Sequence, residues 1–505
     1  MRTSAAGTEN RRRKTMRTTQ VSRDSAVMHG PGKEMKGNTI PELSPETRRR
    51  RTGRPPKRSS GARSAAQPVT TRQSSEEEEV PKVSENEKVT EVLERVYKPR
   101  RLLEAWRQVK RNAGAAGIDH MSVTEFEARK GELLRLTRNG LRAGTYRFKP
   151  ARRVLIPKPG KPGKFRKLGI PVVMDRLVGQ SMHVVLGEIF DPTFTRSNFG
   201  FRPNKSQHQA IEYVRGLVVK GYRWCASIDL KSFFDEIPHE LVFRLLRRRI
   251  ADERFMTLVA RALKAGVVVE GKFERTTKGV PQGSPLSPIL SNVVLNEMDH
   301  ELERRGLKYA RWADDFVLLA RSRRAAQRAM DNVSAYLENV LGLPVNRDKS
   351  VVAKMSEVTF LGFRIFRRKI RVSPEAAEKF KHQVRELTHR NNPLSMHAAI
   401  QKLSRYLRGW SAYFRVQEFK SLFGQIDPWI RRRLRSMQLS KWKKPRKFQR
   451  LMISAGFSPG EARGTWVAMR AWRSSRRKEV QIVLDARWFR KMGLVFLSDH
   501  TLAPT

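Results

Sequence analysis

The segment Lys308–Arg321 reads K-Y-A-R-W-A-D-D-F-V-L-L-A-R and decides the fold expected for this chain. Two short apolar runs flank Ala313, Asp314 and Asp315, which is the pattern of a β-hairpin whose tight turn carries two adjacent carboxylates. A solvated Asp-Asp turn is common in proteins, so the segment alone leaves that reading open. Burying two like charges at this turn is costly unless cations lie beside them.

A third acid stands at the end of another predicted strand. Trp224–Leu230 is a β-like run that contains Asp229, 85 residues before Asp314. Carboxylates from two neighbouring strands can hold two Mg²⁺ ions roughly 3.5–4 Å apart, one activating a hydroxyl and the other bridging a triphosphate. We therefore predict Asp229 and Asp314 as metal ligands, with Asp315 in support and the backbone carbonyl of Leu230 as a further oxygen ligand.

A Gly- and Pro-fixed turn lies between these acids. Gly279–Pro288 reads G-V-P-Q-G-S-P-L-S-P and opens a predicted helix of mostly buried-type residues. Such a turn at a helix N-terminus lets the backbone approach a base pair or a phosphate closely. Taken alone, the segment also fits an ordinary loop.

The charge of the whole chain indicates a polyanionic partner. Among 505 residues, 103 Lys and Arg stand against 49 Asp and Glu, which gives a formal net charge of +54 and an isoelectric point near 11.3. Nucleic acid is therefore favoured over an acidic membrane surface as the partner, and small-molecule metabolism does not need this charge. The one cysteine, Cys225, excludes a disulfide framework and a Cys-rich zinc site. Because no long apolar run occurs, we expect a cytoplasmic protein associated with nucleic acid, without a membrane.

Composition divides the chain into four regions. Residues 1–87 lack the apolar side chains needed for a core, so we expect a disordered basic tail that either grips phosphates or acts as a solvated spacer. Residues 88–372 mix short β-branched runs with helical patterns, which predicts an α+β domain. Residues 373–442 are largely helical and begin at Ser373, a good N-cap. Residues 443–505 are expected to form a small basic C-terminal domain that binds nucleic acid.

The acids and the turn stand among further short motifs along the chain. In order, the motifs are Ile156-Pro157-Lys158, Leu168-Gly169-Ile170-Pro171, Asp175-Arg176, Gly200-Phe201-Arg202-Pro203, Asp229 with Phe233-Phe234, Pro281–Pro288, Ala313-Asp314-Asp315 and Phe360-Leu361-Gly362-Phe363. In this order and spacing they resemble the group II intron-encoded reverse transcriptase/maturase family. The resemblance implies a right-hand polymerase, with fingers and a palm built on an antiparallel sheet, followed by an α-helical thumb or maturase domain.

The resemblance also implies contacts to an incoming dNTP. Phe234 would stack under the sugar and exclude a 2′-hydroxyl. Lys158 and Arg166 would hold the triphosphate, for which the guanidinium fork suits two oxygens. Gln282 and Gly283 would line the nascent base pair.

The resemblance extends to two further positions. Lys349 stands where related polymerases keep a lysine near the leaving pyrophosphate, although a solvated turn lysine fits equally well. Trp312 stands where the family usually has tyrosine, which keeps an aromatic ring and loses a hydroxyl, so we expect activity to survive.

The helical region after Ser373 resembles the thumb, or maturase domain, of the family. Its marker is Arg405–Phe414, which reads R-Y-L-R-G-W-S-A-Y-F. Aromatic residues at helical spacing are more often core, so we assign Trp410 and Phe414 to packing. Three arginines are left for RNA binding: Arg405, Arg408 and Arg415.

We therefore expect an RNA-directed DNA polymerase of a group II intron that also binds intron RNA to promote splicing and retrohoming. Its partners would be the intron RNA, a DNA target, an RNA template with a DNA primer, and dNTPs, and its cofactor would be two Mg²⁺ ions. Two alternatives stay open: a domesticated reverse transcriptase with a host role in repair or defence, and a non-catalytic RNA-binding splicing factor. The presence of all three acids argues against the second alternative, because carboxylates would repel phosphate in a protein that only binds RNA.

Overall fold

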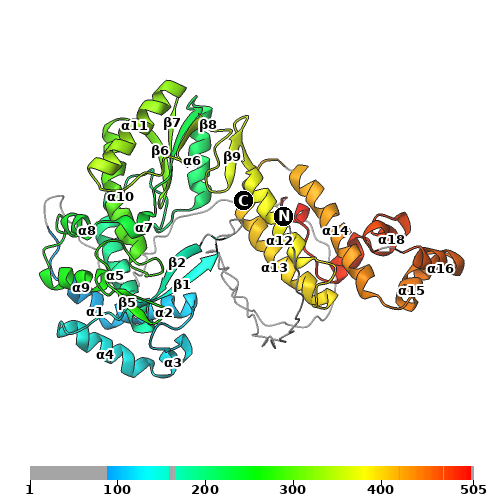
Figure 1. Ribbon diagram of the computed structural model, residues 1–505, viewed down its shortest axis with the longest axis horizontal. Coiled ribbons are helices and arrows are strands. Elements are labelled where there is room, and N and C mark those ends of the chain that lie inside the picture. Colours follow the sequence, from blue (N-terminus) through cyan, green and yellow to red (C-terminus); the bar gives the residue numbers. More distant parts are fainter. Residues whose placement is uncertain (1–87, 158–162, 164, 420, 470, 502–505) are drawn as a thin grey trace, which may run out of the picture. The chain divides into compact units, whose positions relative to one another are not determined.

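The computed structural model describes residues 88–157, 163, 165–419, 421–469 and 471–501, so the tail predicted at residues 1–87 lies outside the described residues. Along the chain, a mostly helical region with a small sheet comes first (Figure 1). A larger antiparallel sheet with its own helices follows, and the last part is helical.

The first region corresponds to the predicted fingers. Its sheet has the strand order β2-β1-β4-β5, in which β1 pairs antiparallel with β2 and parallel with β4. Its elements are α1 (Val92–Tyr97), α2 (Pro99–Asn112), α3 (Val123–Ala128), α4 (Lys130–Arg142), β1 (Ala151–Pro157), β2 (Phe165–Ile170), α5 (Val173–Phe190), η1 (Asp191–Thr193), β4 (Val267–Val269) and β5 (Lys272–Glu274).

The central sheet corresponds to the predicted palm and has the order β6-β7-β3-β8, with all neighbours antiparallel. Its elements are α6 (Gln207–Val219), β3 (Trp224–Ile228), α7 (Phe233–Glu236), α8 (His239–Leu246), α9 (Glu253–Leu263), α10 (Ser287–Arg304), β6 (Lys308–Trp312), β7 (Asp315–Ala320), α11 (Arg323–Asn339) and β8 (Val351–Lys354). The hairpin predicted around the Asp-Asp turn is confirmed as β6 and β7.

Strand β7 is buried on both of its faces. Phe316 and Leu318 belong to one core cluster together with residues of α11, whereas Val317 and Leu319 belong to a second cluster with residues of α6. Figure 1 shows these helices beside the sheet. Burial on both faces explains why the strand reads as a continuous apolar run instead of alternating with polar residues.

A short hairpin leads into the helical region. Ser373 caps α12, because its hydroxyl accepts a hydrogen bond from the Ala376 amide at 3.1 Å, which confirms the predicted helix start. The elements are β9 (Phe363–Phe366), β10 (Lys369–Val372), α12 (Pro374–Leu387), α13 (Met396–Phe414), α14 (Ser421–Lys441), α15 (Arg446–Ser454), α16 (Pro459–Val467), α17 (Ala471–Ser474), α18 (Lys478–Val483), α19 (Ala486–Lys491) and η2 (Ser498–Thr501).

The helices break near residue 443, where a domain boundary was predicted, but the core continues across that break. Leu403 of α13, Leu434 of α14 and Phe489 of α19 belong to one cluster of buried residues. The Asp427 carboxylate also accepts a hydrogen bond from the Leu497 amide at 3.0 Å. The division of the chain into four regions otherwise stays a prediction.

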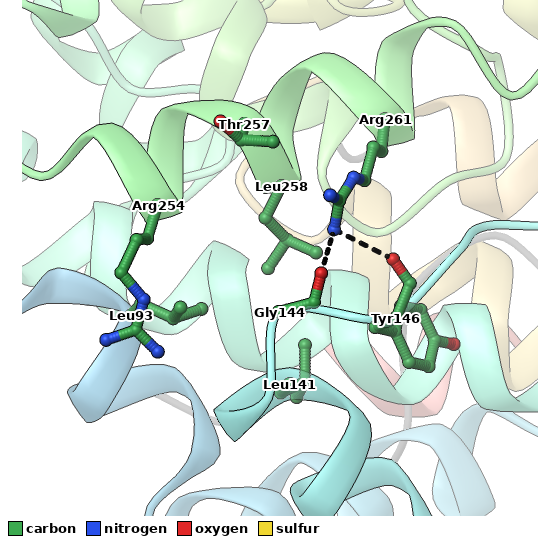
Figure 2. A pocket seen from close by; sticks show the side chains of 8 residues that line it. All are labelled: Leu93, Leu141, Gly144, Tyr146, Arg254, Thr257, Leu258 and Arg261. Atoms are coloured by element: carbon green, nitrogen blue, oxygen red, sulfur yellow. Dashed lines mark hydrogen bonds between the residues drawn. The ribbon is translucent and has the colours of Figure 1, made fainter.

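A cavity of about 130 Å³ lies where α1 and α4 of the first region meet α9 (Figure 2). At its rim, Arg261 donates hydrogen bonds to the carbonyls of Gly144 at 2.6 Å and Tyr146 at 3.2 Å. Arg254 donates to Glu94 at 2.9 Å. Because both guanidinium groups bond to the protein itself, we interpret them as contacts that join α9 to α1 and to the loop after α4. In the described part of the chain, no helix is both long and apolar enough to span a bilayer.

Candidate active site

The register of the central sheet brings the three predicted acids to one end. Ile228 pairs with Phe316 across antiparallel strands, so the next residues outward, Asp229 and Asp315, stand opposite each other. Opposed residues on such strands have Cβ atoms about 4.5–5.5 Å apart. Asp314 lies in the adjoining turn between β6 and β7. Residues distant in sequence therefore share one edge, as the sequence predicts.

The three carboxylates act on one another electrostatically. The pKa of Asp314 is raised by burial and by the charge of Asp229, while the charges of Arg166 and Arg311 oppose the shift. Desolvation, followed by the charges of Asp314 and Asp229, raises the pKa of Asp315 to about 7. The Asp315 residue is nevertheless exposed to solvent. Repulsion from the neighbouring carboxylates is therefore the firmer cause of its raised pKa. Such an excess of negative charge favours a bound cation.

Lys349 lies against the first of these acids. Its Nζ is 2.8 Å from Oδ2 of Asp229, and the two side chains are 56% and 41% exposed. The Asp229 amide donates to Oγ of Ser350 at 3.1 Å. Lys349 thus lies in an exposed turn that borders the acidic site, and both predicted readings stay open. Its role near a leaving pyrophosphate stays a prediction.

Leu230, whose carbonyl is a predicted metal ligand, forms a short antiparallel bridge with Val345. The hydrogen bonds around this bridge use the amide of Lys231 and the carbonyl of Asp229, each at 2.8 Å. The Leu230 carbonyl takes no part in them. The predicted coordination by Leu230 is compatible with this pairing and stays a prediction.

No group of three His, Cys, Asp or Glu side chains in the described residues is arranged to hold a metal ion. The Asp229 carboxylate is paired with Lys349 instead. The donor set itself fits a hard divalent cation, because carboxylate oxygens are the ligands that Mg²⁺ prefers. Binding would require Asp229 to exchange its ammonium partner for the metal.

The residues predicted to contact the dNTP are placed unequally. Lys158 lies outside the described residues, whereas Arg166 is exposed on β2 and its charge reaches Asp314. Phe234 is half-buried in α7, with its ring centroid 5.2 Å from that of Phe233 in an edge-on arrangement. Phe233 is a core residue. Phe234 is therefore the aromatic residue of the pair that can still meet a ligand.

The turn at Gln282 and Gly283 packs against β2. The Gly169 amide donates to the Gln282 carbonyl at 2.7 Å, and the Val280 amide donates to the Phe234 carbonyl at 2.7 Å. Gly283 has φ +109°, and a Cβ there would overlap the Gly169 carbonyl oxygen. Only glycine fits this position. Two motifs far apart in sequence thus form one wall that also holds Phe234.

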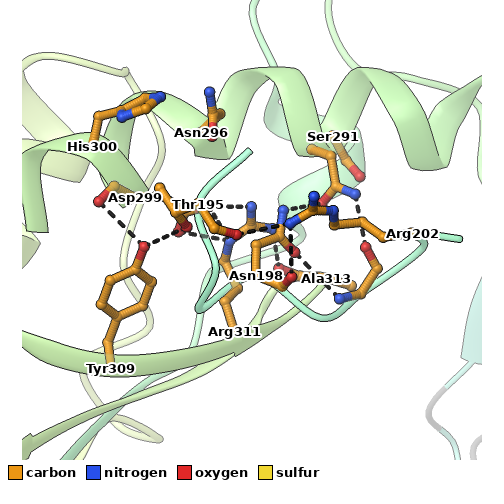
Figure 3. Close-up of polar contacts among 12 residues, drawn as sticks. Thr195, Asn198, Arg202, Ser291, Asn296, Asp299, His300, Tyr309, Arg311 and Ala313 are labelled. Atoms are coloured by element: carbon orange, nitrogen blue, oxygen red, sulfur yellow. Dashed lines mark hydrogen bonds and ion pairs between the residues drawn. The ribbon is translucent and has the colours of Figure 1, made fainter. Parts of the chain in front are cut away.

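A buried polar network beneath the acidic turn was not predicted (Figure 3). Arg311 and Asp299 have fully buried side chains, and Nε of Arg311 donates to both Asp299 oxygens at 2.9 and 3.0 Å. NH1 of Arg311 donates to the Ala313 carbonyl at 3.1 Å and to Oδ1 of Asn292 at 2.9 Å. The available signal was a charged residue within a strand whose neighbouring residues are apolar.

The predicted RNA-binding arginines lie on or just after α13 and are all exposed: Arg405, Arg408 and Arg415. Trp410 and Phe414 are buried, which confirms their predicted packing role. The exposed arginines are thus backed by an aromatic core.

Tyr413 links α13 to the palm. Its hydroxyl donates to the Leu361 carbonyl at 2.9 Å, and its own carbonyl bonds Nε2 of His208 at 2.6 Å. The Leu361 amide in turn bonds the Asp315 carboxylate. Tyr413 also stacks on Phe363, with ring centroids 5.7 Å apart, so its side chain packs at this junction.

Comparison with known protein families gives the same assignment as the motifs. Residues 156–365 match the family described as reverse transcriptase (RNA-dependent DNA polymerase), and residues 377–453 match the group II intron maturase-specific domain. The chain belongs to the group II intron reverse transcriptase/maturase family. The predicted α+β polymerase fold and the enzyme class, RNA-directed DNA polymerase with a maturase domain, are thereby confirmed. Dependence on a divalent cation is general to this class.

Individual relatives differ in how much they share with this reverse transcriptase. Protein YkfC of Escherichia coli (strain K12) is 35% identical over 326 residues, which cover 56% of this chain and 85% of YkfC. The group II intron-encoded protein LtrA of Lactococcus lactis subsp. cremoris is 26% identical over 357 residues, covering 56% of this chain and 59% of LtrA. A telomerase structure from Candida albicans covers 65% of this chain and 67% of its own, with 13% identity and a TM-score of 0.37.

Proposed function

We propose that this reverse transcriptase copies RNA into DNA from dNTPs at the edge formed by Asp229, Asp314 and Asp315. We further propose that it binds a group II intron RNA to promote splicing and retrohoming, and that it works in the cytoplasm. The observation that supports the polymerase site is the β3–β7 register, which sets Asp229 opposite Asp315 and beside the turn at Asp314.

In this proposal, Asp229 and Asp314 hold two Mg²⁺ ions, with Asp315 in support and the Leu230 carbonyl as an additional ligand. Bound ions of this kind neutralise charge on the triphosphate and make the primer 3′-hydroxyl a better nucleophile. The carboxylates repel one another, and a bound cation would relieve this repulsion, which supports a cation requirement. Removing one acid would remove both a ligand and a repulsive charge.

The other residues of the site bind and orient the nucleotide. Arg166 on β2 offers a bidentate donor to the triphosphate from the side of the fingers. Lys349 is already beside the acids and can pair with an incoming phosphate when it leaves Asp229. Gln282 and Gly283 present a wall on which the new base pair rests.

The polymerase proposal is tested with the purified full-length protein, an RNA template, a DNA primer, dNTPs and Mg²⁺. We expect primer extension to the end of the template, and none when Mg²⁺ is chelated. Binding of intron RNA without any dNTP incorporation would contradict the proposal and support a non-catalytic splicing factor. For the maturase role, the protein is expected to raise the spliced fraction of the group II intron RNA that encodes it.

Phe234→Ala is expected to weaken the discrimination between dNTPs and rNTPs. The ring is half-buried, and the Phe234 carbonyl bonds the Val280 amide next to the Gln282 turn. Loss of the ring would open space for a 2′-hydroxyl. Relief of one such contact changes selectivity by about 10–200-fold. Single-nucleotide incorporation of dNTP and rNTP on one template measures the ratio of kcat/KM. Phe233→Leu, a change inside the core, serves as the control and should leave that ratio unchanged.

RNA binding is expected to weaken steeply with salt. The slope of log K against log salt is about −0.7 for each single-strand phosphate neutralised and about −0.9 for each duplex phosphate. Replacing Arg405, Arg408 and Arg415 together with Gln should reduce the slope by about 2–3 units. Filter binding of intron RNA across a salt series measures it. Arg304→Gln is the control, because Arg304 is paired with Glu301 at 2.7 Å. An equal slope in the triple variant and in the parent would show that Arg405, Arg408 and Arg415 do not contact the RNA.

A further inference from the structure

The acidic turn contains a residue in an unfavourable backbone conformation. Ala313 has φ +57°, a left-handed value that a non-glycine residue rarely adopts. Such conformations persist when surrounding contacts over-determine them. The contacts that hold Ala313 therefore also fix the direction in which the following residue, Asp314, projects.

Arg311 supplies a buried polar contact to this turn (Figure 3). Its NH1 donates to the Ala313 carbonyl at 3.1 Å and to Oδ1 of Asn292 at 2.9 Å. Nδ2 of Asn292 donates to the Gly200 carbonyl at 2.8 Å. A Cβ on Gly200 would overlap the Ala313 amide nitrogen, so the Gly200 backbone lies directly against the same turn. One guanidinium thus joins the turn to two other segments.

Asp299 of α10 fixes the orientation of Arg311. Nε of the arginine donates to both carboxylate oxygens, at 2.9 and 3.0 Å, and NH2 bonds Oδ2 as well. Both side chains are fully buried, so water does not compete for these bonds. A planar guanidinium held along one edge has its remaining N–H groups aimed in fixed directions, which an ammonium cannot reproduce.

We propose that Arg311 is a positioning residue for catalysis, which, oriented by Asp299 and Asn292, holds the Ala313 backbone so that the Asp314 carboxylate faces Asp229. The inference rests on the proposed polymerase function and extends it to a residue that touches neither nucleotide nor metal. It differs from a purely stabilising role, because Arg311 bonds the backbone of the turn itself.

Two variants test the proposal. Arg311→Lys keeps a cation opposite Asp299 but cannot bond Asn292 and Ala313 at the same time. The double variant Arg311→Met with Asp299→Leu removes both buried charges together, so neither is left unpaired. A double variant of the interhelical pair Arg101→Met with Glu188→Leu, joined at 2.6 Å, is the matched control.

The readouts separate positioning from stability. A displacement of about 1 Å costs on the order of 100-fold in rate, so both Arg311 variants should lose about 10–100-fold in kcat while the dNTP KM and the affinity for template–primer stay within about threefold. Mn²⁺ titration followed by electron paramagnetic resonance should show weaker binding to both, at a temperature where thermal unfolding shows each variant to be fully folded. The control should match the parent in all of these.

Parental kcat and parental Mn²⁺ affinity in either folded variant would overturn the proposal. Failure of both variants to fold would also overturn it, in favour of a role confined to stability. If the parent binds Mn²⁺ but incorporates no dNTP, the polymerase proposal fails, whereas weaker Mn²⁺ binding by Arg311→Lys would still support positioning of the acids.

Discussion

Asp314→Asn is expected to lower the rate of dNTP incorporation by about 1,000-fold or more, while RNA binding stays at the parental level. The amide keeps the shape of the side chain and loses the charge that would hold a divalent cation. A loss of about 4 kcal/mol of transition-state stabilisation corresponds to this factor. Single-turnover primer extension on an RNA template, with enzyme in excess, measures the chemical step.

The same substitution is expected to leave the metal-free protein at least as stable as the parent. Burial and the charge of Asp229 raise the pKa of Asp314 above its unfolded value. A carboxyl group shifted in this direction makes folding less favourable as pH rises from the unfolded pKa through the folded one. Asn removes that loss at neutral pH. Thermal unfolding in chelator at pH 7 should therefore give an equal or higher midpoint.

Asp331→Asn is the matched control for this experiment, because Asp331 is exposed on α11, where its carboxylate accepts a hydrogen bond from Nε2 of Gln327 at 3.0 Å. It should extend primers at the parental rate. Primer extension by Asp314→Asn at that same rate would falsify the assignment of Asp314 as a metal ligand, and a lower midpoint would contradict the electrostatic argument.

The sequence predicted the local parts of this site well. The hairpin around Asp314 and the strand that ends before Asp229 are read from short apolar runs and from a turn, which depend only on neighbouring residues. That β3 inserts between β7 and β8 is not a local property. The predicted meeting of the acids therefore came from the order of motifs and a family resemblance, and the register supplies its geometry.

Residues whose role depends on a partner from another element were harder to predict from the sequence. Arg311 reads as a charge in a short strand, and the sequence does not show that Asp299, on the preceding helix, lies beside it with no solvent between them. Lys349 left two readings open because its partner Asp229 is 120 positions away. Tyr413 is one of several aromatic residues in the marker segment, and the sequence does not show that its hydroxyl reaches the Leu361 carbonyl, 52 positions away.

Gly200→Ala is expected to reduce dNTP incorporation by about 100-fold through a displacement of the acidic turn. A Cβ at this position would overlap the Ala313 amide nitrogen and lie 3.0 Å from the Trp312 carbonyl carbon. Both neighbours are backbone atoms, so the clash is relieved only by moving the turn or the Gly200 segment. Overpacking of this kind costs about 1–3 kcal/mol in stability, and a shift near 1 Å at the reacting groups costs about 100-fold in rate.

The control is Gly216→Ala, because Gly216 lies within α6 and a Cβ there meets nothing within 4 Å. Alanine should stabilise that helix by up to about 1 kcal/mol and leave catalysis unchanged. Primer extension and thermal unfolding are measured for both variants. Because the added methyl group of Gly200→Ala carries no charge, a loss of rate without a loss of template–primer affinity would locate its effect in the geometry of the turn. Parental kinetics in Gly200→Ala would mean that the turn moves freely and that its backbone position does not set the direction of Asp314.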